Sequence, residues 1–175
     1  MMNLLGNKNV FAIELSKDIA AYQMSLYING KDILQFKANG TIYSYRWRDF
    51  NDIKEWFQEN LKFILQDDEF PLEVSGDSAA ELCELSYKMD LDDIEQYEKL
   101  QDWMFRHSWF SARAGSFLAD VYFRKVKDKI EISWDNRDTF KEEGIVYIYS
   151  KGKSSIDICQ FSETINSFIS VYNQL

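Results

Sequence analysis

The sequence predicts a single α+β domain in which a largely antiparallel sheet, built from N-terminal and C-terminal strands, packs against three or four helices. Two observations favour this class. Apolar and polar residues alternate near both ends of the chain, as in half-buried strands, whereas residues 49–105 show the three-and-four spacing of amphipathic helices. The order of strands, helices, strands and a final helix is neither a βαβ alternation nor a repeat array.

The first part of the chain predicts an antiparallel meander of three or four strands. The expected strands span residues 10–15, 22–28, 31–36 and 41–47. Asn29-Gly30 and Asn39-Gly40 separate the last three, and Asn-Gly is the preferred sequence of a two-residue hairpin turn.

Helical periodicity starts at Asp49, the expected N-cap of a helix that continues to Gln66 and ends at Asp67-Asp68. Its apolar stripe consists of Phe50, Ile53, Trp56, Phe57, Leu61, Ile64 and Leu65. After Pro71 we expect a short strand at 72–74. Two further helices are expected at 78–85 and 92–105. In the second, one apolar face contains Ile94, Tyr97, Leu100, Gln101 and Met104.

The last third of the chain returns to strands. The strands are expected at residues 119–126, 130–135, 144–150 and 154–160, with turns at 127–129 and at Lys151-Gly152. A final helix is predicted to be capped by Ser162, with Phe161 as a hydrophobic staple before it. Its apolar face consists of Ile165, Phe168, Ile169 and Tyr172.

Composition indicates that residues 1–175 form one domain. With 46% hydrophobic and 16% aromatic residues, a chain of this length builds a core without a metal or disulfide. Cys83 and Cys159 are therefore expected to be reduced core thiols. The start of the chain lacks the features of a signal peptide, and no apolar run approaches the ~18 residues of a membrane helix. We expect a cytoplasmic protein without a membrane partner.

The net charge of −9 argues against direct nucleic-acid binding, which needs a positive surface. The charge is also unevenly distributed. Thirteen acidic and two basic residues lie between Asp67 and Asp102, a local net charge of −11, so the rest of the chain sums to +2. An acidic segment that also carries aromatic residues suits the electrostatic capture of a basic protein.

Signals for catalysis or cofactor binding are weak. The only histidine, His107, supports an alternative in which the protein is a small hydrolase that uses His107, Ser108 or Ser111, and carboxylates of the acidic segment. A calcium loop starting at Asp90 fails, because Glu95 stands where the loop needs glycine. No zinc spacing and no glycine-rich phosphate loop occurs, so no cofactor is expected.

A resemblance favours the binding function. The stretches 103–107, 112–115, 118–124 and 132–136 read WMFRH, ARAG, LADVYFR and ISWDN. They lie within residues 103–136, about a fifth of the chain, and resemble a pattern of bacterial immunity proteins, which are encoded beside polymorphic or contact-dependent growth-inhibition toxins. The resemblance implies a small cytosolic protein without enzymatic activity that neutralises a cognate toxin domain, commonly a nuclease, by tight binding.

The acidic segment and the resemblance together predict the toxin-binding residues. A nuclease binds a polyanion and is usually basic, which complements the acidic segment. The expected contact residues are Asp90, Asp92, Asp93, Glu95, Glu98 and Asp102, with Trp103 and Trp109 as aromatic anchors. The carboxylates are expected to mimic phosphates in front of a basic active-site cleft.

Overall fold

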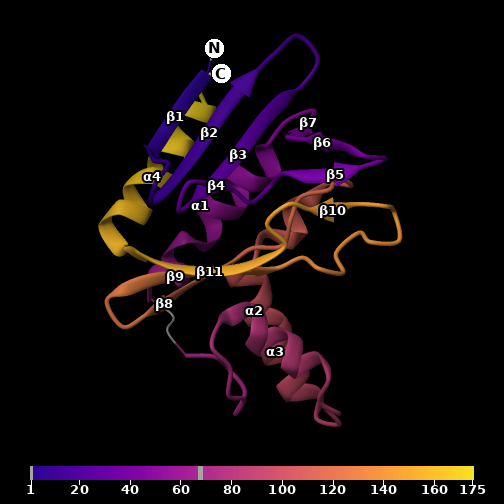
Figure 1. The fold of residues 1–175 in the computed structure, drawn as a ribbon. Helices are drawn as coiled ribbons and strands as arrows, with labels where there is room; N and C mark the ends of the chain where they lie inside the picture. The colour runs from indigo at the N-terminus through magenta and orange to yellow at the C-terminus, as the bar shows by residue number, and fades with distance from the viewer. Residues whose placement is uncertain (1, 67–68) are drawn as a thin grey trace.

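The computed structural model describes residues 2–66 and 69–175 (Figure 1). It confirms the α+β class, with four α-helices and strand pairs that are all antiparallel within the described residues. The strands form three separate hydrogen-bonded sheets rather than one continuous sheet. Within these residues, no helix is both long and apolar enough to cross a membrane.

The first sheet comes from the N-terminal part of the chain. Its strands are β1 (Met2–Asn7), β2 (Phe11–Lys17), β3 (Tyr22–Ile28), β4 (Lys31–Asp32) and β7 (Tyr45–Trp47). Asn29 and Gly30 form the predicted hairpin turn, with φ of 50° and 78°. The predicted strand 31–36 ends early because the Asp32 side chain is buried and accepts hydrogen bonds from the N–H groups of Leu26 and Leu34.

The second sheet is small and joins distant parts of the chain. It contains β5 (Phe36–Ala38), β6 (Thr41–Tyr43) and β10 (Val146–Tyr147), with β5 in the middle. Asn39-Gly40 forms the predicted turn between β5 and β6. The single strand predicted at 41–47 is divided between the second and first sheets, and the strand predicted at 144–150 shortens to the two residues of β10.

The third sheet consists of β8 (Tyr122–Val126), β9 (Lys129–Asp135) and β11 (Lys151–Asp157), with β9 in the middle. The turn predicted at Lys151-Gly152 is wrong, because both residues lie in β11. Gly152 pairs with Trp134, and a Cβ atom at this position would lie 2.5 Å from Cζ2 of that indole. Only glycine lets the indole lie across the strand.

Helices α1 (Asn51–Gln66) and α4 (Ile158–Tyr172) pack against each other. Asp49 accepts a hydrogen bond from the Asn51 N–H but lies one residue before the cap position, Phe50, whose carbonyl oxygen accepts from the Lys54 N–H. The predicted end at Asp67-Asp68 lies outside the described residues. α4 begins four residues before Ser162, because Asp157 caps it by accepting from two backbone N–H groups. Ser162 as cap and Phe161 as staple are therefore wrong.

The main core lies around α1 and α4. α4 contacts β1 and β2 of the first sheet and β9 and β11 of the third. Phe123 of β8 lies within this core, with its ring centroid 5.3–6.0 Å from the rings of Trp56, Phe57, Trp109 and Phe161. Of the two thiols, both free, Cys83 is buried as predicted, but Cys159 is exposed on α4.

The remaining helices lie on the opposite face of the third sheet. They are α2 (Ala79–Tyr87) and α3 (Ile94–His107), and the 3₁₀ helix η1 (Trp109–Arg113) follows them. Figure 1 shows α2 and α3 projecting away from the first two sheets, below the third. The strand predicted at 72–74 is absent, since these residues are not hydrogen-bonded into any sheet.

Candidate protein-binding site

The predicted acidic segment forms a projecting part of the molecule, which we call the acidic lobe (residues 69–107). Its α2 starts on the third sheet, where the Ala79 N–H donates to Glu131 Oε1 at 2.8 Å and the Ala80 N–H donates to Ser133 Oγ at 3.1 Å. Ser78 caps the same helix by accepting from Glu81 N–H. Polar side chains of β9 thus fix the lobe to the rest of the fold.

The lobe has a small apolar core of its own, separate from the main core. It consists of Ala79, Ala80, Cys83, Leu100, Trp103, Met104 and Tyr122. Tyr122 belongs to β8, so this cluster joins both helices to the outer face of the third sheet. Because α2 and α3 bury their apolar sides against each other and the sheet, their outer sides remain available to a partner.

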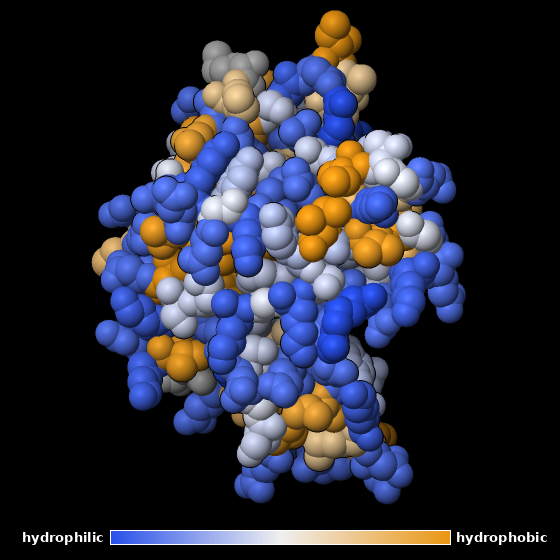
Figure 2. All heavy atoms as spheres, viewed as in Figure 1, coloured by the Kyte–Doolittle hydropathy of each residue, from blue (hydrophilic) through white to orange (hydrophobic). Residues whose placement is uncertain are grey.

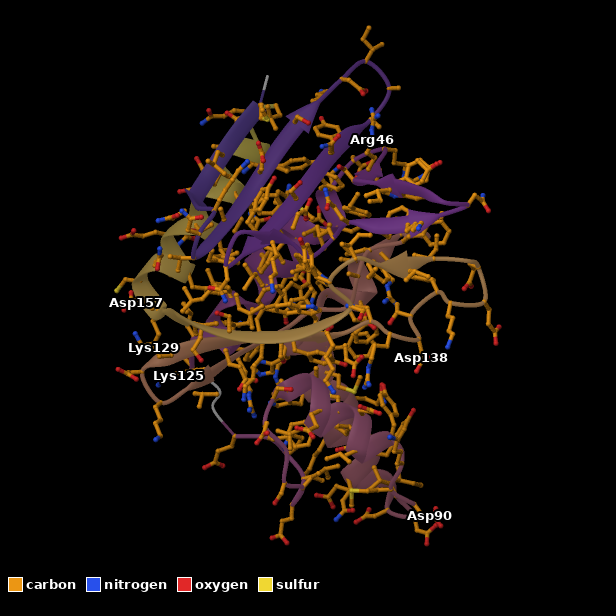
Figure 3. The ribbon with its side chains drawn as sticks, viewed as in Figure 1. Arg46, Asp90, Lys125, Lys129, Asp138 and Asp157 are labelled. Atoms are coloured by element: carbon orange, nitrogen blue, oxygen red, sulfur yellow. The ribbon has the colours of Figure 1, made fainter. Side chains whose placement is uncertain are left out.

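All six carboxylates predicted to bind the partner are exposed. They are Asp90, Asp92, Asp93, Glu95, Glu98 and Asp102, and Figure 3 shows Asp90 at the end of the lobe farthest from the sheets. Two of them also stabilise α3: Asp93 caps the helix by accepting from the Glu95 N–H, and Glu95 pairs with Lys99 at 2.6 Å.

Exposed apolar side chains lie among these carboxylates. Tyr87 is 59% exposed, Met89 44%, Ile94 74% and Tyr97 51%. The apolar face predicted for residues 94–104 is therefore buried only in its later turns, at Leu100 and Met104. The first turn extends past the lobe's small core, which leaves Ile94 and Tyr97 in solvent.

Three of these apolar residues, Tyr87, Met89 and Tyr97, line a shallow hollow of about 170 Å³ between the two helices. Its walls are Ser86, Tyr87, Met89, Leu91, Tyr97 and Leu100. We call residues 86–98, which include most of these walls and the carboxylates from Asp90 to Glu98, the lobe tip. In Figure 2 hydrophobic atoms over the lobe are bordered by hydrophilic ones. An apolar hollow with a charged rim is typical of protein-binding surfaces.

The prediction that Trp103 and Trp109 are surface anchors is wrong. Trp103 is 2% exposed and its ring lies 4.9 Å from that of Phe70. Trp109 is fully buried, and its Nε1 donates to the carbonyl oxygen of Ala119 at 2.8 Å. Both indoles hold elements of the fold together, so Tyr87, Met89, Ile94 and Tyr97 are the aromatic and aliphatic anchors that this surface offers.

His107, the proposed base of the alternative hydrolase, is also a packing residue. It is fully buried, its ring stacks on Trp103 with centroids 4.3 Å apart, and Nδ1 donates to the carbonyl oxygen of Phe123 at 2.8 Å. Ser108 beside it is fully buried as well. A substrate has no access to this pair in the structure. Among residues 2–66 and 69–175, no group of three His, Cys, Asp or Glu side chains is placed to hold a metal ion.

Comparison with known proteins does not assign the chain to a family: no family model, curated protein or solved structure matches it.

Proposed function

We propose that the protein binds a basic protein partner through the lobe tip, and that the partner is a bacterial toxin domain which it neutralises in the cytoplasm. The observation that carries the proposal is the hollow between α2 and α3, whose walls Met89, Leu91 and Tyr97 are followed or preceded in the chain by exposed carboxylates. The resemblance of residues 103–136 to immunity proteins supports the toxin as the partner. A nuclease domain is the favoured class, because its own substrate demands a basic surface.

The two parts of the lobe tip have different physical roles. Complementary charge accelerates encounter and is screened by salt, whereas apolar anchors that enter a partner's pockets slow dissociation. Truncating an anchor of this kind typically weakens the binding free energy by about 2 kcal/mol or more. Ile94 and Tyr97 are the best candidates, since both are more than half exposed and therefore contribute little to the fold.

The direct test is co-purification of a tagged copy with the C-terminal domain encoded immediately upstream of its gene. The expected result is a nanomolar complex whose association rate falls with rising salt. Absence of a complex at both low and high salt would remove the toxin-binding proposal.

Two sets of variants then separate the roles of charge and apolar contact. Replacing Asp90, Asp92 and Glu98 by Lys should slow association, and these three avoid the cap Asp93 and the ion-paired Glu95. The same change in charge at exposed Asp128, Glu142 and Glu143, outside the lobe, is the matched control and should have a smaller effect.

Ile94→Ala combined with Tyr97→Ala should instead raise the dissociation rate about 30-fold or more, which corresponds to the ~2 kcal/mol of one anchor. Equal effects of the lobe-tip and control charge variants, with unchanged dissociation of the alanine variant, would place the interface elsewhere.

A further inference from the structure

A second hollow, of about 220 Å³, lies between α2 and the outer face of the third sheet. Its walls are Ala80, Cys83, Glu84, Tyr87, Asp120, Tyr122, Asp135, Arg137, Asp138 and Thr139. Tyr122 of β8 pairs with Ser133 of β9, whose Oγ accepts from the Ala80 N–H of α2, and Asp135 lies two residues after Ser133. Side chains two residues apart in a strand share a face, so these walls point toward α2.

A guanidinium group already lies at the mouth of this cavity. Arg137 donates to both carboxylate oxygens of Asp135, from Nε at 2.8 Å and from Nη2 at 2.6 Å. The same Nη2 lies 3.9 Å from Oε2 of Glu84 on α2. Two parallel hydrogen bonds to a carboxylate are the geometry in which arginine is recognised. The cavity mouth, near Asp138 in Figure 3, therefore already accommodates this chemical group.

A further carboxylate, that of Asp120, lines the same cavity. Its Oδ1 accepts from Arg113 Nη2 at 2.6 Å, and its side chain keeps 27% exposure at the cavity wall. Burial raises the pKa of Asp120, and the Arg113 guanidinium only partly offsets this effect. A second cation near a desolvated carboxylate would favour its charged form.

The cavity adjoins the lobe tip, because Tyr87 lines both hollows. A partner that covers the lobe tip would pass over Tyr87 and reach the cavity mouth. We propose that the cavity receives an arginine side chain of the partner, placed between Tyr87 and the carboxylates of Glu84 and Asp120. This inference rests on the proposed function, since it supplies one anchoring contact of the same interface.

The test uses small probes rather than the toxin domain, so it remains informative if the toxin-binding proposal fails. The peptide acetyl-Gly-Arg-Gly-amide is titrated into the ¹⁵N-labelled protein, and the neutral citrulline peptide of the same shape is the control. We expect the arginine peptide to shift the amide signals of Cys83, Tyr87 and Asp135, and to bind about tenfold more tightly than the citrulline peptide.

Variants locate the binding. Glu84→Gln, on a half-buried residue of α2, and Asp120→Asn should each weaken the arginine peptide several-fold, with folding checked by thermal unfolding. Asp128→Asn, which changes the charge equally at an exposed residue outside both the cavity and the lobe, should leave its affinity unchanged. Arg137→Ala should tighten binding, because it removes the internal guanidinium.

Two results would overturn the inference. One is equal binding, or none, of the arginine and citrulline peptides to both the wild type and Arg137→Ala. The other is a loss of peptide affinity in Asp128→Asn as large as in Glu84→Gln. If the peptide binds as expected but the upstream-encoded domain does not, the arginine site stands and the choice of partner is wrong.

Discussion

Replacing Glu131 with alanine should loosen the acidic lobe from the third sheet. Glu131 is 6% exposed and serves two groups at once. Its Oε1 accepts from the Ala79 N–H at the start of α2, and both carboxylate oxygens accept from Arg124 at 3.0 Å. Removing the carboxylate leaves a buried backbone donor and a largely buried guanidinium without their acceptor.

The expected loss follows from these two groups. Breaking a buried ion pair from one side costs about 3–5 kcal/mol, because the remaining charge stays desolvated. The Arg124 side chain is 12% exposed and can turn toward water. We therefore expect a loss in unfolding free energy at the lower end of this range, about 3 kcal/mol. The unsatisfied Ala79 N–H is part of the same loss. The free energy of unfolding of a small domain is only about 5–15 kcal/mol in total, so this loss is a large part of it.

Urea unfolding measures the loss, and amide hydrogen exchange shows where it acts. We expect faster exchange in α2 than in α1 or α4, because the broken contacts belong to the lobe. Glu131→Gln should lose less unfolding free energy than Glu131→Ala, since its amide oxygen can still accept from the Ala79 N–H. Glu143→Ala, an exposed control, should stay within about 0.5 kcal/mol of wild type. A loss below about 1 kcal/mol in Glu131→Ala would refute this account of how the lobe is held.

Three further predictions test other parts of the fold. Gly152→Ala should displace the Trp134 indole and cost about 1–3 kcal/mol in thermal unfolding, whereas unchanged stability would contradict the close contact. A thiol reagent at neutral pH should modify Cys159 alone in the folded protein and both thiols in denaturant, because burial raises the pKa of Cys83 to about 12. Burial also raises the pKa of Asp32 above 3.8, so the folded state binds this proton more tightly than the unfolded chain. The contribution of Asp32 to stability should therefore fall as pH rises from about 4, and urea unfolding of Asp32→Asn across this range should show a smaller fall than wild type.

The sequence predicts best the elements whose pattern is local. The stripe of residues 49–66 predicts α1, and the two Asn-Gly pairs predict their turns, because each signal depends only on neighbouring residues. It predicts poorly the strands whose partners are distant. Residues 41–47 read as one strand, yet β6 pairs with β5 and β7 with β3. β1 is not predicted, since most of its side chains are exposed and only its pairing with β2 makes it a strand.

The same limit explains the errors in the predicted site. The exposed carboxylates are predicted because charge alone keeps them at the surface. Trp103 shares a helix face with Leu100 and His107, at spacings of three and four, and this signal alone identifies it as a core residue. Tyr87 offers no such signal. Its exposure depends on how the end of α2 meets α3, which is a tertiary property.

The two faces of the third sheet separate stability from binding. One face contributes to the main core, whereas the other carries a lobe held by a small cluster and the polar contacts of Glu131 and Ser133. Like charges concentrated in this lobe repel one another, and this repulsion destabilises the lobe rather than the main core, which contains none of these charges. A basic partner would neutralise that repulsion. Binding should therefore stabilise the lobe more than the rest of the fold, and its slowed hydrogen exchange would identify the bound surface.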